Sequence, residues 1–224
     1  MHRTRSHGTL PLVLAASAAL ALAGCTATAA TAPTPSSAGA PSESPATPDE
    51  ATELGAVPEP VPSGEVVAQG LVLDAGTPVL CLGDVAASAP PQCGGIPLVG
   101  WDWSAIDGWE QSASTRWGSY AVQGTFDGET FRVTADPISL ALYDVAPIPE
   151  APREPGTTPE DELARIQGVL QDALGDRLLA GQPVDGTLDA TVVFDDGTLQ
   201  EHLDEVYGAN VVRVMSAMRA VDAP

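Results

Sequence analysis

The chain has 224 residues, with 30 acidic side chains against nine basic ones, and its net charge is −21 at pH 7. Such a charge repels nucleic-acid phosphates and anionic lipid headgroups, so nucleic-acid binding is excluded. Acidic side chains can also bind divalent cations, but Asp195-Asp196-Gly197 lacks the ligand spacing of a calcium loop. We therefore interpret the acids as a solvated surface, and we expect neither a metal site nor a cofactor.

The first 25 residues have the three parts of a secretory signal. Two arginines make a basic start, residues 10–22 are an apolar run, and Ala23-Gly24 precedes Cys25. The run of 13 residues is shorter than the about 20 that a membrane-spanning helix needs. This arrangement resembles the signal of bacterial lipoproteins, in which the cysteine is lipidated, whereas the alternative is a secreted protein with a chance cysteine. We expect residues 1–24 to be removed and Cys25 to be lipidated, so that acyl chains hold the protein on the outer side of the cell membrane.

Residues 26–63 are dominated by Ala, Thr, Ser and Pro, with eight prolines among 38 residues. This composition cannot bury enough apolar surface to fold, and it favours extended polyproline conformations. We expect residues 25–63 to be a disordered tether. Its reach lies between ~35 Å as a coil and ~115 Å when extended.

Residues 64–144 are expected to form an all-β module. Alternating patterns predict strands at 65–73, 77–82, 98–103, 117–126, 129–135 and 138–143. Asp127-Gly128 is the strongest hairpin signal in the chain. Five or six short strands joined mostly by tight turns favour a small barrel or sandwich, and an OB-like barrel is our first choice.

Cys81 and Cys93 are the two cysteines that remain if Cys25 carries lipid. Disulfides persist outside the cytoplasm, and two thiols allow only one intramolecular pairing. The closed loop would contain 13 residues, counted inclusively, and such a bridge is worth about 3 kcal/mol in the chain-entropy model. A redox pair or half of a metal site is the alternative, but neither cysteine belongs to a C-x-x-C motif. We expect a structural disulfide.

All four tryptophans lie within 17 residues, at positions 101, 103, 109 and 117. Trp101 and Trp103 share the parity of the predicted strand, so we expect them to point to the same face. Such a face suits a buried core, and it equally suits a ligand surface on which sugar rings stack. We favour core packing, but we keep Trp101, Trp103 and Trp109 as a possible ligand surface, with Trp109 as the most exposed ring.

Residues 145–157 are a Pro-rich linker, and residues 158–224 follow a different pattern. A helix start at Thr158 precedes apolar residues at helical spacing, namely Leu163, Ile166, Leu170 and Leu174. Alternation predicts a strand at 188–194, and Thr198 with Glu201 has the signature of a capping box for a second helix. A last strand is expected at 211–215. The order α-β-α-β suggests a small module with parallel strands, and the whole chain is expected to be α+β.

No catalytic motif stands out in the chain. It contains no G-x-S-x-G, H-E-x-x-H, Walker or G-x-G-x-x-G sequence. His202 is the only histidine of the mature chain, and we interpret it as a surface residue rather than a general base. Carboxylate pairs can hydrolyse glycosides, but spacing alone selects none among 30 acids. We therefore assign no catalytic residue.

Four short segments resemble a group of uncharacterised lipoproteins of high-GC Gram-positive bacteria. They are Cys81-Leu82-Gly83, Pro90-Pro91-Gln92-Cys93, Gly100-Trp101-Asp102-Trp103 and Asp195-Asp196-Gly197-Thr198-Leu199-Gln200. The resemblance runs from about Gly64 to Val221. It implies the same lipid anchor, disulfide and two-part body, but it lends no activity and no site residues.

These observations predict a membrane-anchored extracytoplasmic lipoprotein with a non-catalytic role. We expect it to bind an envelope protein or a wall glycan. The alternatives are an envelope enzyme that acts on wall polysaccharide and an accessory subunit of a membrane complex.

Overall fold

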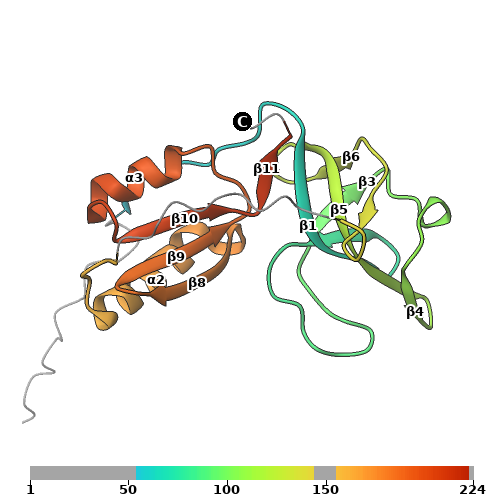
Figure 1. Cartoon of the computed structure of the whole chain (residues 1–224), viewed down its shortest axis with the longest axis horizontal. Helices are drawn as coiled ribbons and strands as arrows, with labels where there is room; N and C mark the ends of the chain where they lie inside the picture. Colours follow the sequence, from blue (N-terminus) through green and yellow to red (C-terminus); the bar gives the residue numbers. More distant parts are fainter. Residues whose placement is uncertain (1–53, 144–154, 222–224) are drawn as a thin grey trace, which may run out of the picture. The chain divides into compact units, whose positions relative to one another are not determined.

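The computed structural model describes residues 54–143 and 155–221. The expected signal peptide, Cys25, most of the expected tether and most of the Pro-rich linker lie outside these residues. The described residues form an α+β fold with a closed barrel, a separate three-stranded sheet and two α-helices (Figure 1).

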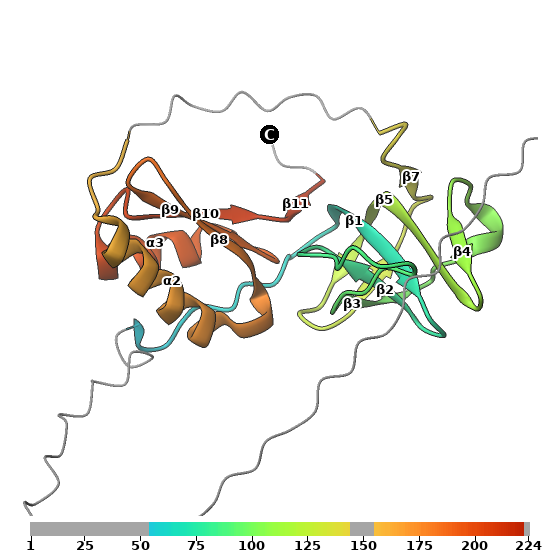
Figure 2. The same cartoon turned by 90° about the horizontal axis from the view of Figure 1, so that it is seen from below.

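Five strands close the barrel. They are β1 (Val66–Asp74), β2 (Pro78–Cys81), β3 (Ile96–Val99), β6 (Phe131–Val133) and β5 (Thr115–Phe126), paired in that order. The circuit closes because β5 also pairs with β1, from Val66 opposite Gly124 to Asp74 opposite Arg116. The β3–β6 pair is parallel, and the other pairs of the circuit are antiparallel. Figure 2 shows β1, β2, β3 and β5 around the barrel.

Alternation along β5 sends every second side chain into the barrel. Tyr120, Val122 and Phe126 are buried, whereas Ser119 and Thr125 are exposed on the outer side. Gly118 also faces inward, and a Cβ at that position would come within 2.8 Å of the Tyr120 hydroxyl. The Tyr120 ring therefore fills the space that a side chain at position 118 would need.

Three short strands pair at the margins of the barrel. β4 (Glu110–Ser112) and β7 (Ile138–Ser139) pair with β5, and β11 (Met218–Ala220) pairs antiparallel with β1. Met218 is fully buried and belongs to the core cluster of the barrel. The last described strand of the chain thus completes a core whose other strands come from residues before 140.

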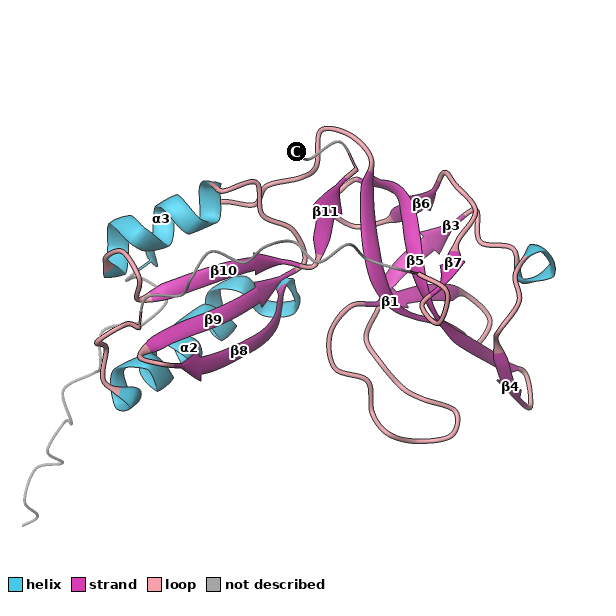
Figure 3. Cartoon of the chain, viewed as in Figure 1, coloured by secondary structure: helices cyan, strands magenta, loops and turns pink. Residues whose placement is uncertain are grey.

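The second sheet contains β8 (Leu178–Val184), β9 (Thr187–Val192) and β10 (Val212–Ser216), in the order β10-β9-β8. Helix α2 (Glu160–Leu174) precedes β8, and α3 (Thr198–Tyr207) connects β9 to β10 (Figure 3). The β9–β10 pair is parallel, as the sequence predicts for strands on either side of the second helix. The buried side chains of both helices join one core cluster with all three strands.

Several element predictions are wrong in detail. The strand expected at 98–103 ends at Val99, because Gly100 has φ of +87° and Trp103–Ala105 forms a 3-10 turn. The strand expected at 138–143 is limited to Ile138–Ser139. One strand was expected between α2 and α3, but the structure has two, which form the antiparallel hairpin β8–β9. β8 carries Gly181 and Pro183, which weaken a strand signal.

The capping box expected at Thr198 and Glu201 is also wrong. Gly197 is the N-cap residue, with φ of +102°, and two aspartates before it supply the capping oxygens. Asp195 accepts a hydrogen bond from the Leu199 N–H at 3.0 Å, and Asp196 accepts one from the Thr198 N–H at 3.1 Å.

The last ten residues of the expected tether differ from the prediction. Leu54 is only 2% exposed and belongs to the core cluster of the second sheet. His202 Nε2 donates a hydrogen bond to the Leu54 carbonyl oxygen at 2.9 Å. Arg177 donates to the Pro58 carbonyl oxygen and forms an ion pair with Glu59, both at 3.1 Å. This part of the expected tether is therefore packed against the folded chain.

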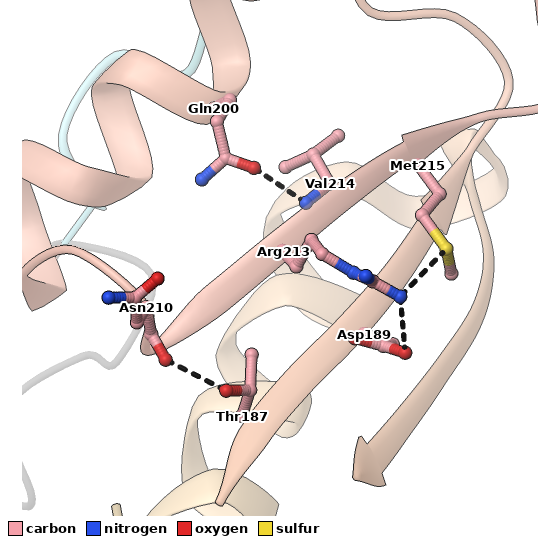
Figure 4. A network of polar contacts seen from close by, with 7 residues as sticks. All are labelled: Thr187, Asp189, Gln200, Asn210, Arg213, Val214 and Met215. Atoms are coloured by element: carbon pink, nitrogen blue, oxygen red, sulfur yellow. Dashed lines mark hydrogen bonds and ion pairs between the residues drawn. The ribbon is translucent and has the colours of Figure 1, made fainter. Parts of the chain in front are cut away.

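A network of polar contacts surrounds β10 (Figure 4). Gln200 on α3 accepts a hydrogen bond from the Val214 N–H at 2.8 Å and donates one to the Val212 carbonyl oxygen at 2.9 Å. On β10 itself, Arg213 forms an ion pair with the mostly buried Asp189 of β9 at 3.1 Å. These side chains satisfy backbone and charged groups of the parallel pair.

Candidate binding groove on the barrel

The sequence correctly predicts a disulfide between Cys81 and Cys93, whose Cα atoms lie 6.1 Å apart. The bridge closes the long loop between β2 and β3, residues 82–95 (Figure 3). Inside this loop the Ala86 N–H donates to the Gln92 carbonyl oxygen at 2.9 Å, and the Ser88 hydroxyl donates to the Pro90 carbonyl oxygen at 2.8 Å. The disulfide and these bonds hold the loop in a closed shape beside the barrel.

This loop forms one wall of an open groove of about 770 Å³. Outward-facing residues of β1 and β5 line it, including Gln69, Leu71, Trp117 and Ser119. Residues 139–141 contribute a second wall. The groove is therefore built on the outer surface of the β1–β5 pair, which is the longest ladder of the barrel.

The lining of the groove is mainly neutral. Among the described residues that line it, Glu110 is the one carboxylate, and arginine and histidine are absent from that set. The polar side chains are otherwise hydroxyls and an amide, including Ser119, Ser139 and Gln69. Hydrolysis of a glycoside by the common route needs two carboxyl groups on either side of the bond. The groove thus has binding chemistry but lacks that acid pair.

The structure places Trp101 and Trp103 in an aromatic cluster of the barrel core. Trp103 is 8% exposed, and its Nε1 donates to the Asp74 carboxylate at 2.9 Å. The Trp101 ring meets the rings of Trp103 and Tyr120 edge to face, with centroids 5.3 and 5.2 Å away. The two tryptophans do not share a strand, since β3 ends before them. Their contacts favour core packing over a ligand surface.

Trp109 is 37% exposed and lies at the margin of that cluster. Its Nε1 donates to the Ile106 carbonyl oxygen at 3.1 Å, and the Arg116 guanidinium lies 5.2 Å from the ring centroid. This distance allows a cation–π interaction, which uses one face of the ring. Trp109 does not belong to the lining of the groove.

Trp117 is the tryptophan that lines the groove, and the sequence interpretation did not select it. It lies opposite Leu73 of β1 and Glu110 of β4. Strand parity could have identified it: Trp117 and Ser119 alternate with the apolar residues that fill the barrel. The prediction missed this signal because it grouped Trp117 with the other three rings by their closeness in sequence.

Every carboxyl group with a resolved pKa shift has its pKa lowered, and hydrogen bonds are the main cause. The Ser104 hydroxyl and N–H hold the pKa of Asp102 below its ordinary value, and the Thr198 hydroxyl and N–H do the same for Asp196. Burial, and secondly the Asp107 carboxylate, raise the pKa of the Tyr120 hydroxyl. A carboxyl that acts as a general acid near neutral pH needs a raised pKa, and these carboxyl shifts run the other way.

In comparisons with known proteins, no protein family, curated protein or solved structure matches the chain. Within residues 54–143 and 155–221, no helix has the length and apolar character needed to cross a membrane. The same residues contain no group of three or more His, Cys, Asp or Glu side chains arranged to hold a metal ion.

Proposed function

We propose that this chain is a lipoprotein on the outer side of the cell membrane, where its folded part binds an envelope component without catalysing a reaction. The basic start, the apolar run of 13 residues and the small residues before Cys25 support the anchor. The disulfide between Cys81 and Cys93 is in keeping with a compartment where such bonds persist. The four short segments that resemble lipoproteins of high-GC Gram-positive bacteria point to the same location.

One observation carries the non-catalytic role: the barrel groove is open, and the described residues that line it supply an aromatic ring, hydroxyls and an amide, with Glu110 as their one carboxylate. Binding sites combine apolar or aromatic surface with a few polar groups that fix orientation. Hydrolytic sites add a converging acid and base. The described lining of the groove combines aromatic surface with a few polar groups, and it has no converging acid and base.

The topology of the barrel supports the finer proposal of an OB-like module. Five strands close in a circuit, and the parallel β3–β6 pair shows that the chain does not simply run up and down. Barrels of the OB type bind oligonucleotides and oligosaccharides. Because a chain with a net charge of −21 repels the phosphates of an oligonucleotide, an oligosaccharide is the more suitable ligand.

The anchor is tested by replacing Cys25 with alanine in the full chain. Wild-type protein should take up a clickable palmitate analogue and fractionate with membranes, whereas Cys25→Ala should remain unlabelled and be released. Cys93→Ala is the control, because it removes a cysteine outside the signal and should still be labelled. Labelling of Cys25→Ala at the wild-type level would refute the anchor.

The binding role is tested by purifying the tagged, lipidated protein from crosslinked native membranes and identifying its companions. Enrichment of wall glycan or of an envelope protein would support binding. One protein at near-equal amounts would indicate the accessory-subunit alternative. Release of sugar from purified wall material by the protein would instead establish an envelope enzyme.

A further inference from the structure

The floor of the barrel groove offers side chains rather than free backbone groups. β1 pairs with β5 along its whole length, and its other edge pairs with β11 at Val66–Ala68 and with β2 at Leu71–Asp74, so most of its N–H and C=O groups are used in ladders. An extended peptide that adds a strand needs an unpaired edge. Recognition at this floor must therefore come from side chains that stand out of the sheet.

Those side chains are suited to a ligand rich in hydroxyl groups. Gln69 and Ser119 are exposed, and among the described residues they and Ser139 make no side-chain hydrogen bond to the protein. Amides and hydroxyls can both donate and accept, which matches the double capacity of a sugar hydroxyl. Glu110 can accept a further hydrogen bond at the margin.

The charge of the groove indicates which sugars fit. The described residues of its lining include no arginine or histidine to pair with a phosphate, sulfate or uronate group, and the chain as a whole is strongly negative. An anionic saccharide would meet Glu110 with no cation to offset the repulsion. A neutral saccharide avoids that cost.

We propose that the groove binds a neutral oligosaccharide, with one sugar ring stacked on Trp117 and its hydroxyls bonded to Gln69, Ser119 and Ser139. The inference rests on the proposed function as a binding module and names the class of its ligand. The Trp117 ring supplies the apolar face, and it lies between Leu73 of β1 and Glu110 of β4 on the neighbouring strands. The disulfide-closed loop forms the wall that limits the groove on one side.

The test uses the full lipidated chain in a zwitterionic detergent, since sugar-based detergents would compete for the groove. Chitotetraose, maltotetraose and mannotetraose are titrated by calorimetry and by tryptophan fluorescence, with tetragalacturonate as the anionic counterpart. At least one neutral saccharide should bind with a Kd of about 1 mM or tighter. The anionic one should bind at least about tenfold more weakly.

Three variants locate the site. Trp117→Ala should weaken the neutral saccharide by about tenfold or more, as expected for loss of an aromatic anchor. Ser119→Arg changes an exposed position and should block the groove while leaving the fold intact. Trp109→Ala is the matched control, because it removes an exposed tryptophan outside the groove, and it should bind as wild type does.

Two results would overturn this inference. One is wild-type affinity in Ser119→Arg together with loss of affinity in Trp109→Ala, which would move the site to the aromatic cluster. The other is a complete lack of binding to the three neutral saccharides at about 1 mM. If a crosslinked envelope protein is still recovered in that case, the binding role survives and only the saccharide is refuted.

Discussion

Gln200 performs, with one side chain, a task that usually needs a neighbouring strand. β10 is an edge strand, and its outer N–H and C=O groups would otherwise be unpaired beneath α3. The Gln200 amide accepts from the Val214 N–H (Figure 4) and donates to the Val212 carbonyl oxygen, as a peptide group of an added strand would. The exposed edge is therefore closed to other strands.

Replacing Gln200 with leucine tests how much these two hydrogen bonds stabilise the protein. The change keeps the size of the side chain but leaves two part-buried backbone groups unpaired, so we expect a loss of about 1–3 kcal/mol in the free energy of unfolding. Urea denaturation of the full chain measures it. Gln171→Leu, at an exposed position on α2, is the control and should change stability by less than about 0.5 kcal/mol. Equal losses in both variants would refute this role of Gln200.

At the scale of elements, β11 is the strand whose importance is least evident from its length. It contains three residues, Met218–Ala220, and pairs with the first residues of β1. The Met218 side chain is nevertheless fully buried in the barrel core, where it belongs to one cluster with side chains of β1, β5 and β6. The barrel therefore depends on residues that follow the second sheet in sequence.

We expect Met218→Ala to destabilise the protein by about 2–5 kcal/mol, because it opens a cavity in a closed barrel. Arg219→Ala, the neighbouring residue on the same strand, should stay within about 0.5 kcal/mol of wild type. Thermal unfolding followed through the tryptophan cluster measures both variants. A loss in Met218→Ala no larger than that of the control would show that β11 adds little to the barrel.

The sequence predicts those parts of the fold that depend on local pattern. Alternation located β1, β2, β5 and β6, helical spacing located α2, and the presence of only two cysteines besides Cys25 located the disulfide. β8 and β11 were missed because Pro183, Gly181 and a three-residue strand carry almost no local signal. The groove was missed for a related reason: it forms only when the loop 82–95 and residues 139–141 meet over β1 and β5.

At the scale of the whole molecule, the folded part begins earlier than composition suggests. Residues 54–63 have the prolines and small side chains of a tether, yet Leu54 is buried in the core of the second sheet. His202 donates a hydrogen bond to the Leu54 carbonyl oxygen, and Arg177 donates one to the Pro58 carbonyl oxygen. Two apolar side chains, Leu54 and Val57, hold the segment against the folded chain, together with two hydrogen bonds to carbonyl oxygens and the Arg177–Glu59 ion pair.

Leu54→Ala should therefore lower the free energy of unfolding by about 2–5 kcal/mol, because it opens a cavity in the core. Truncating the side chain of a residue in an unfolded tether would leave this free energy unchanged. Limited proteolysis should also cut the chain more readily between residues 54 and 64 in the variant than in wild type. Val61→Ala is the control within the same segment, since its side chain is 45% exposed. Wild-type stability of Leu54→Ala would assign residue 54 to the tether after all.

The packing of Leu54 also determines how the molecule would respond to mechanical force. A pull from an anchor at Cys25 reaches Leu54 first, then the Arg177 contacts at Pro58 and Glu59. These contacts can break one after another, so residues 54–63 would detach at low force and lengthen the chain ahead of the barrel. β1, held along both edges by β2 and β5, would have to shear many hydrogen bonds at once. Residues 54–63 thus form a weakly held section ahead of the barrel, and a pull applied from the N-terminal side would unfold this section before it loads β1.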